Sequence, residues 1–149
     1  MRGDRVAVES SASISVDAMI SNGVREGPDI DAIATKSGDA VSVLMWNYHD
    51  DDVPAAAAPA RISITGLPAS AGRVLLKHYR IDRDHSNAFT VWKQMGSPQN
   101  PTPEQYARLD SAGQLQLLES PRWLRSESGR VEVSFALPRQ AVSLVQVSW

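Results

Sequence analysis

The sequence predicts a mainly β protein: an antiparallel β-sandwich of the fibronectin or immunoglobulin type, with a two-helix insert at about residues 86–112. Three observations support this prediction. Short runs of alternating apolar and polar residues recur along the chain, turns rich in Gly and Pro separate them, and one helical, proline-containing stretch interrupts the alternation. The 149 residues contain no long linker, so they are expected to form a single domain, residues 1–149.

The first third of the chain predicts three strands and one short helix. Residues 5–10 (RVAVES) and 29–39 (DIDAIATKSGD) alternate between apolar and polar positions, as a half-buried strand does. Residues 15–24 (SVDAMISNGV) predict a helical turn that ends at Asn22-Gly23. Residues 40–49 (AVSVLMWNYH) are apolar on both faces, which predicts a central strand covered from both sides.

The remaining strands follow a polar loop at residues 50–60 (DDDVPAAAAPA). Residues 61–67 (RISITGL) alternate between apolar and polar positions, and residues 72–82 (GRVLLKHYRID) form the next predicted strand. Near the end of the chain, residues 130–138 (RVEVSFALP) place their apolar residues on one face, and residues 141–149 (AVSLVQVSW) form the last predicted strand. Seven or so short strands at this spacing indicate two packed antiparallel sheets.

The insert predicts two helices. In residues 86–96 (SNAFTVWKQMG), Phe89 and Trp92 lie at helical spacing before a glycine that can end the helix. In residues 100–113 (NPTPEQYARLDSAG), Thr102 is the expected N-cap, with Pro103 at the first helical position and a capping box completed by Gln105. Two helices do not fit between packed sheets, so we expect them on the outside of the domain or against another domain.

Composition excludes several classes of function. The net charge is −2 and the 15 Lys and Arg residues are scattered, so no nucleic-acid partner is predicted. No apolar run approaches the roughly 20 residues that span a bilayer, so no membrane partner is predicted. The absence of Cys removes disulfides and thiolate chemistry. The first residues, MRGDRVAVESSAS, resemble sequence from inside a longer protein. A soluble protein is expected, and its compartment is left open.

Candidate catalytic and metal residues each have a simpler structural interpretation. His49 and the three aspartates after it could ligate a hard cation, but consecutive carboxylates point in different directions, which favours a solvated loop. His78 is expected to be structural. In residues 83–87 (RDHSN), Asp84, Ser86 and Asn87 are expected to cap and pack the strand-to-helix junction. No glutamate lies in a recognisable catalytic context, so no catalytic, cofactor-binding or metal residue is assigned.

One stretch resembles a known family. Residues 78–121 (HYRIDRDHSNAFTVWKQMGSPQNPTPEQYARLDSAGQLQLLESP) are similar to the C-terminal region of bacterial β-xylosidases of glycoside hydrolase family 39, which also includes the α-L-iduronidases. The segments GDRVAVESS, VLMWNYHDDDVP and LPRQAVSLVQVSW resemble flanking parts of the same region, in the same order. The resemblance therefore extends over essentially the whole chain.

The resemblance implies an accessory domain. Enzymes of this family consist of a (β/α)8 catalytic barrel and a β-sandwich, and they are retaining glycosidases whose acid/base glutamate lies in an Asn-Glu-Pro motif. This sequence contains no Asn-Glu-Pro and no βα repeat, so neither catalytic glutamate can be assigned to it. The expected function is that of a non-catalytic C-terminal domain that packs on and stabilises the barrel.

The insert is the expected contact with the barrel, and its loop, residues 96–102, is expected to extend toward the mouth of the active site. Six residues on the insert and the strand before it are the candidate interface: Tyr79, His85, Asn87, Phe89, Trp92 and Tyr106. The expected partner is the catalytic barrel, with xylo-oligosaccharide as a second candidate; an uncovered surface would also allow self-association. A carbohydrate-binding module for xylan and a fibronectin-like interaction domain are the alternatives.

Overall fold

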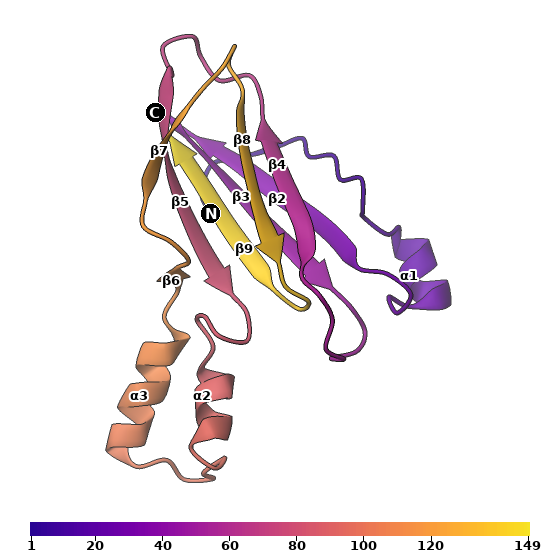
Figure 1. The fold of residues 1–149 in the computed structure, drawn as a ribbon, viewed down its shortest axis with the longest axis vertical. Helices are drawn as coiled ribbons and strands as arrows, with labels where there is room; N and C mark the ends of the chain where they lie inside the picture. Colours follow the sequence, from indigo (N-terminus) through magenta and orange to yellow (C-terminus); the bar gives the residue numbers. More distant parts are fainter.

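The computed structural model describes residues 1–149 and contains two antiparallel sheets and three short helices (Figure 1). The larger sheet has seven strands in the order β1-β2-β3-β9-β5-β6, and β7 pairs with β5 off this path; β4 and β8 form the smaller sheet. The strands are β1 (Asp4–Val6), β2 (Asp29–Ser37), β3 (Ala40–Tyr48), β4 (Ala58–Ile64), β5 (Arg73–Ile81), β6 (Gln116–Leu117), β7 (Arg122–Arg125), β8 (Val131–Leu137) and β9 (Val142–Ser148). The predicted mainly β class is confirmed.

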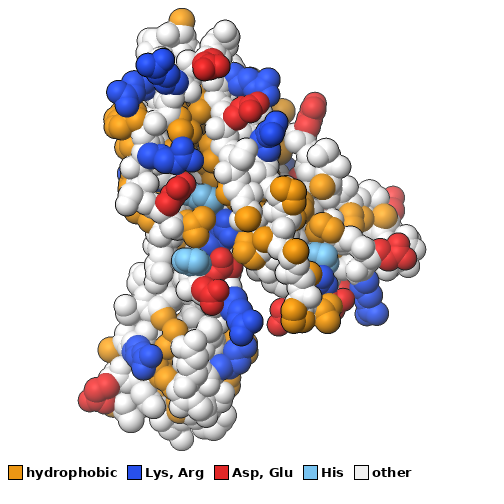
Figure 2. Space-filling model, in the orientation of Figure 1, with side chains coloured by type: hydrophobic (Ala, Val, Ile, Leu, Met, Phe, Trp, Pro, Cys, Tyr) orange, Lys and Arg blue, Asp and Glu red, His pale blue; other side chains and the backbone are white.

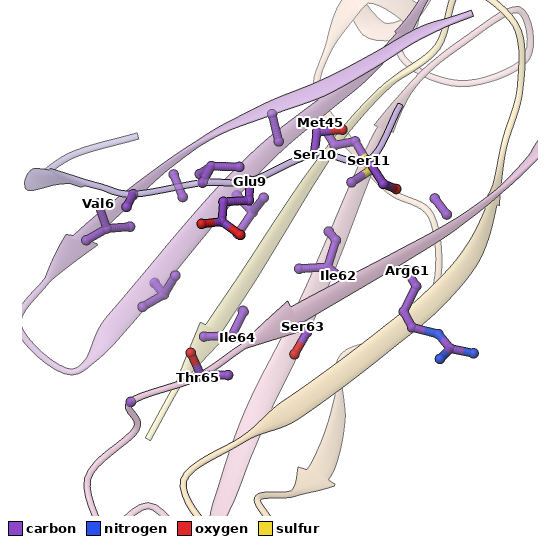
Figure 3. A pocket seen from close by; sticks show the side chains of 18 of the residues that line it. Val6, Glu9, Ser10, Ser11, Met45, Arg61, Ile62, Ser63, Ile64 and Thr65 are labelled. Carbon is purple, nitrogen blue, oxygen red and sulfur yellow. The ribbon is translucent and has the colours of Figure 1, made fainter. Parts of the chain in front are cut away.

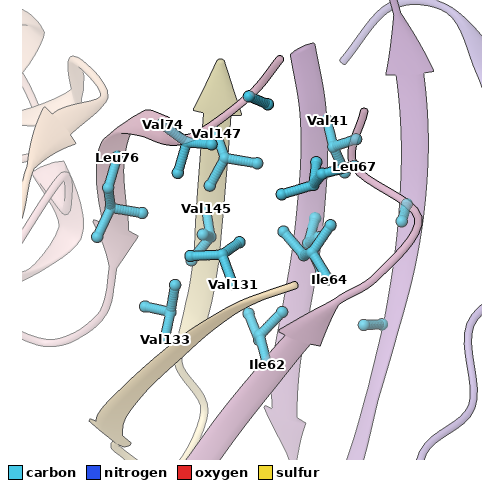
Figure 4. Packing of buried hydrophobic residues seen from close by; sticks show 14 residues of the cluster. Val41, Ile62, Ile64, Leu67, Val74, Leu76, Val131, Val133, Val145 and Val147 are labelled. Atoms are coloured by element: carbon cyan, nitrogen blue, oxygen red, sulfur yellow. The ribbon is translucent and has the colours of Figure 1, made fainter. Parts of the chain in front are cut away.

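The hydrophobic core lies between the two sheets, where β4 and β8 cross the face of the larger sheet (Figure 1). Every second residue of β4 and β8 points inward, so Ile62, Ile64, Val131 and Val133 are buried. They meet inward-facing residues of β3, β5 and β9 in a cluster of 14 buried side chains (Figure 4). The cluster is rich in Val and Ile, which suit a pleated, half-buried surface.

Two strand predictions are corrected by the structure. The strand predicted at residues 5–10 ends at Val6, because the chain then leaves β2 and returns only at an isolated bridge between Ala12 and Ile30. The Ser10 hydroxyl donates a hydrogen bond to the Ile30 carbonyl, so a side-chain hydrogen bond takes the place of a backbone hydrogen bond between strands at this point. Strand β3 is interior in its sheet but is covered on one face only: Val43 is buried, whereas Tyr48 on the opposite face is 46% exposed.

Strands β6 and β7 were not predicted. They are two and four residues long, too short to show an alternating pattern, and both are held by pairing with β5. Strand β4 begins at Ala58, inside the predicted loop at 50–60, and the other predicted strands are confirmed.

The three helices are α1 (Val16–Asn22), α2 (Ala88–Gln94) and α3 (Pro103–Gly113). The predicted helical turn and both helices of the insert are therefore confirmed. Helices α2 and α3 pack side by side and project beyond the end of the sheets (Figure 1). None of the three helices has the length and apolar character that crossing a membrane requires.

Candidate docking surface: the helical hairpin and its base

The hairpin, defined as residues 88–113, carries large apolar side chains but has no residue in its helices that is buried. Phe89 is 60% exposed and Tyr106 is 68% exposed. Trp92 is half-buried: its ring lies 5.6 Å from that of Phe89, and its Nε1 donates a hydrogen bond of 3.0 Å to the Pro98 carbonyl. Figure 2 shows hydrophobic atoms on the surface of the hairpin, which stands apart from the rest of the molecule. Exposed apolar residues gathered on one element are typical of an interaction surface.

Local signals in the sequence define the ends of the two helices. The Asn87 side chain accepts a hydrogen bond of 3.1 Å from the Thr90 N–H at the start of α2. At the start of α3, Thr102 and Gln105 form the predicted capping box, with Pro103 in the first turn. Helices of 7 and 11 residues are too short to be stable in water by themselves. Their order therefore depends on these caps, on their mutual packing and on their attachment to the sheets.

The hairpin is attached at the end of β5 by a buried polar network. His78 and Arg80 point into the core, where His78 is 1% exposed and Arg80 is 2% exposed. Arg80 Nε donates to Ser143 Oγ at 2.9 Å, and Ser143 Oγ lies 3.1 Å from His78 Nε2. Arg80 Nη2 also donates to the Ala136 carbonyl on β8, at 3.0 Å. The network thus connects β5, β9 and β8 where the hairpin leaves the sheet.

Asp82 continues this network into the connection to α2. One carboxylate oxygen lies 3.5 Å from Arg80 Nη1, and the other accepts hydrogen bonds from the backbone N–H groups of Asp84 and His85 and contacts His85 Nδ1 at 2.9 Å. Burial raises the pKa of Asp82, but these hydrogen bonds outweigh burial and hold its pKa below the ordinary value. The carboxylate is therefore the ionised partner of the buried Arg80 guanidinium.

Ser86 joins the two chain segments that lead into and out of the hairpin. Its hydroxyl donates to the Arg80 carbonyl at 2.7 Å and accepts from the Gln116 N–H at 2.8 Å. Asn87 Nδ2 donates to the Asp82 carbonyl at 2.8 Å. The prediction that this stretch caps and packs the junction is confirmed for Ser86 and Asn87. The acceptor role expected of Asp84 is filled by Asp82 instead.

The protonation state of His78 follows from its surroundings. Burial, and to a smaller extent the nearby Arg80 charge, lower the pKa of His78 to about 4. Because Arg80 Nε already donates to Ser143 Oγ, the Ser143 hydroxyl proton is free to be donated to a neutral imidazole. The expectation that His78 is structural agrees with this arrangement: a neutral ring packed 4.5 Å from the ring of Phe135.

The structure places the six candidate interface residues in three locations. Phe89, Trp92 and Tyr106 lie on the hairpin, and His85 and Asn87 lie in its base around Asp82. Tyr79 lies on the outer face of the larger sheet, half-buried, between the inward-facing His78 and Arg80. Their role in contacting a catalytic barrel remains a prediction.

Sequence reasoning missed Arg80, Asp82 and Ser143. A signal for Arg80 was present, because the alternation through Val74, Leu76 and His78 places residue 80 on the buried face. A buried arginine requires an anionic or polar partner. Asp82 is two residues away and was a natural candidate, whereas Ser143 is distant in sequence.

The His49–Asp52 segment does not converge on one point. The Asp50 carboxylate accepts from the Val24 N–H at 2.7 Å and from the Tyr48 hydroxyl at 3.1 Å. Asp51 forms an ion pair with Arg139. The carboxylates therefore stabilise neighbouring loops in different directions, as expected for consecutive residues in an extended chain.

A groove of about 670 Å³ lies between the unpaired side of β4, the inner face of β2 and β3, and residues 7–12 (Figure 3). Ile62 and Ile64 line one wall, and Glu9 is the one carboxylate among the lining residues. Glycoside hydrolysis in its usual form requires two carboxyl groups on either side of the bond that is cleaved. The groove does not supply such a pair.

The family model "Glycosyl hydrolases family 39" matches residues 5–131. The chain therefore belongs to glycosyl hydrolases family 39. It is 27% identical over 120 residues to a β-xylosidase from Geobacillus stearothermophilus, a match that covers 80% of this chain and 23% of that protein. The resemblance to β-xylosidases of this family is thus confirmed.

Solved structures show the same fold. A family 39 enzyme from Xanthomonas axonopodis pv. citri matches with a TM-score of 0.67 at 23% identity, over 78% of this chain and 25% of that one. A monomeric β-xylosidase from Caulobacter crescentus CB15 matches with a TM-score of 0.65 at 22% identity, over 78% of this chain and 26% of that one. A bacterial orthologue of human α-L-iduronidase matches with a TM-score of 0.64 at 23% identity, over 81% of this chain and 22% of that one. The chain spans about a quarter of the length of these relatives.

Proposed function

We propose that this chain is the non-catalytic C-terminal domain of a retaining β-xylosidase and folds as a β-sandwich of the fibronectin type. In this proposal the whole enzyme releases xylose from the non-reducing ends of xylo-oligosaccharides. The chain packs on a (β/α)8 catalytic barrel and stabilises it. Fold alone does not define substrate; the β-xylosidase from Geobacillus stearothermophilus, at 27% identity, supports xylose.

The observation that carries the proposal is the uncovered hairpin. Its base is joined to the sheets by hydrogen bonds and an ion pair of Arg80, Asp82 and Ser86, yet Phe89 and Tyr106 remain mostly in solvent. A bonded attachment at the base and an exposed apolar surface together suit an element that docks on a second domain. The family match, and the fact that this chain spans 23% of its β-xylosidase relative, support a catalytic domain as that partner.

The proposal is tested by mixing the chain with the separately produced catalytic barrel of its enzyme. We expect the chain alone to release no chromophore from a chromogenic xyloside, and the barrel to unfold at a higher temperature when the chain is added. The double variant Phe89→Ala/Tyr106→Ala should lose this stabilisation, whereas Arg61→Ala, an exposed change on β4, should keep it. Turnover by the chain alone, or stabilisation that the double variant retains, would contradict the proposal.

One observation favours the carbohydrate-binding alternative. Trp123 on β7 is 56% exposed, with the Arg73 guanidinium 5.5 Å from its ring centre. An exposed indole is a suitable surface for stacking a sugar ring. This alternative predicts heat of binding in calorimetry of the chain with xylohexaose, which Trp123→Ala abolishes; no measurable binding would remove it.

A further inference from the structure

The two sheets differ in the polarity of their outer faces. On the smaller sheet, outward positions alternate with the core residues and are mostly polar: Arg61, Ser63, Glu132 and Ser134 are all exposed. This is the usual pattern for a sheet with one face in water. The outer face of the larger sheet departs from this pattern.

Strand register aligns apolar residues across that face. Ile33 pairs with Leu44, Leu44 with Leu144, Leu144 with Tyr79, and Tyr79 with Leu117. Residues that are directly paired point to the same side of a sheet. These five residues therefore form one row across β2, β3, β9, β5 and β6, which at the usual strand spacing is about 19 Å wide.

A second row lies beside the first. Trp46 pairs with Val142, and Val142 pairs with Ile81, all on the same face. We call these two rows the outer band. Its residues are Ile33, Leu44, Leu144, Tyr79, Leu117, Trp46, Val142 and Ile81.

No layer of this chain covers the outer band. None of its eight residues is buried: Ile33 is 36% exposed, Leu117 41% and Ile81 43%, and the others are half-buried. The next row across the same face is polar and consists of Thr35, Ser42, Gln146 and Lys77. In this row Gln146 Nε2 donates a hydrogen bond of 3.1 Å to Ser42 Oγ. The outer band is therefore a bounded apolar surface, larger than scattered exposed residues.

The outer band is continuous with the base of the hairpin. Leu117 lies in β6, four residues after the end of α3, and Ile81 is the last residue of β5 before the segment that leads into α2. A single partner can therefore contact the hairpin and the outer band together. A second copy stacked on the sheet would not by itself cover Phe89 and Tyr106, because the hairpin lies beyond the end of the sheets (Figure 1).

We infer that the outer band is a second contact surface for the catalytic barrel, which rests on the proposed function and extends it from the hairpin to the sheet. The barrel would contribute an apolar surface that removes Ile33, Tyr79, Leu117 and Ile81 from water. Contacts on two different elements, the hairpin and the sheet, fix the orientation of a domain, whereas contact through the hairpin alone would leave it free to rotate about that contact.

The test measures the affinity of the 149-residue chain for the separately produced barrel by titration calorimetry. Ile33→Thr and Ile81→Thr keep a β-branched residue in each strand and should each raise Kd about tenfold. Arg61→Thr, a matched change on the polar outer face, should leave Kd within about twofold. Circular dichroism and thermal unfolding verify that each variant is folded. In the wild-type chain, hydroxyl-radical labelling of Tyr79 and Leu117 should decrease when the barrel is bound, which needs no variant.

The outcomes separate this inference from the proposed function. If Phe89→Ala weakens binding while the Ile33 and Ile81 variants behave like Arg61→Thr, and Tyr79 stays labelled, the outer band is not a contact and the proposed function stands. If the wild-type chain does not bind the barrel, both fail. A stable dimer of the chain, or binding of xylohexaose, that is lost in the two isoleucine variants would assign the outer band to another occupant and overturn the inference.

Discussion

The sheets and the hairpin are stabilised in different ways within one chain. All 26 buried residues lie outside helices α2 and α3, and 14 of them form the main core between the sheets. The hairpin has caps, one aromatic stack and a polar base, but no core of its own. Burial of apolar surface dominates folding stability. The sheets are therefore expected to supply most of the stability of the chain, and the hairpin is expected to need a partner to become equally rigid.

The largest expected effect sharpens this comparison. Leu76, which is 1% exposed, lies in the core, and Leu76→Ala should lower the free energy of unfolding by about 3 to 4 kcal/mol. Tyr106→Ala removes a larger side chain from the hairpin but should change the free energy of unfolding by less than about 0.5 kcal/mol. Urea denaturation of both variants measures the difference. Comparable losses would show that the hairpin belongs to the same cooperative core.

The second prediction concerns pH. The folded-state pKa of His78 is about 4, below the ordinary value of 6.5, so the unfolded state binds a proton more readily. The stability that neutral His78 contributes is complete above pH 6.5 and is lost as the pH falls toward 4, by about 3 kcal/mol. Urea denaturation across this range should show the decline.

His78→Gln is the control, because it should reduce the slope between pH 6.5 and 4. The pKa of His49 is also lowered, by burial and by Arg139, so its share of the slope should remain. The lowered pKa values of Asp50 and Asp82 act at more acid pH. An unchanged slope in the variant would show that His78 is not buried in its neutral form.

The smallest expected effect is local to the hairpin. Thr102→Ala removes the N-cap of α3 and should destabilise that helix by about 1 kcal/mol. Amide hydrogen exchange in residues 103–113 should become severalfold faster, while exchange in β3 and β9 stays the same. Faster exchange in those core strands would mean that the hairpin and the sheets unfold together.

Local patterns predicted the secondary structure where they were long enough to recognise. Apolar residues alternate with polar ones in residues 61–64, which lie in β4, and every second residue of 131–137, which form β8, is apolar. The capping box of α3 depends on residues three apart and was predicted correctly. Strands β6 and β7 were not predicted, because their pairing with β5 is determined by the tertiary structure.

The candidate site was only partly predictable for the same reason. The exposed aromatic residues of the hairpin follow from helical spacing, but the base depends on Ser143, which is 65 residues from His78 in sequence. The apolar character of both faces of residues 40–48 was recognised. The sequence did not show that one of these faces would be left uncovered. The smaller sheet has only two strands, and they cover only the inner side of the larger sheet.

The most direct test of the account is amide hydrogen exchange of the hairpin with and without the catalytic barrel. In the isolated chain, residues 88–113 should exchange at least about tenfold faster than β3 and β9, and binding of the barrel should slow exchange in the hairpin and leave those strands unchanged. A hairpin that is already as protected as the core strands in the isolated chain, and that the bound barrel does not affect, would contradict the account.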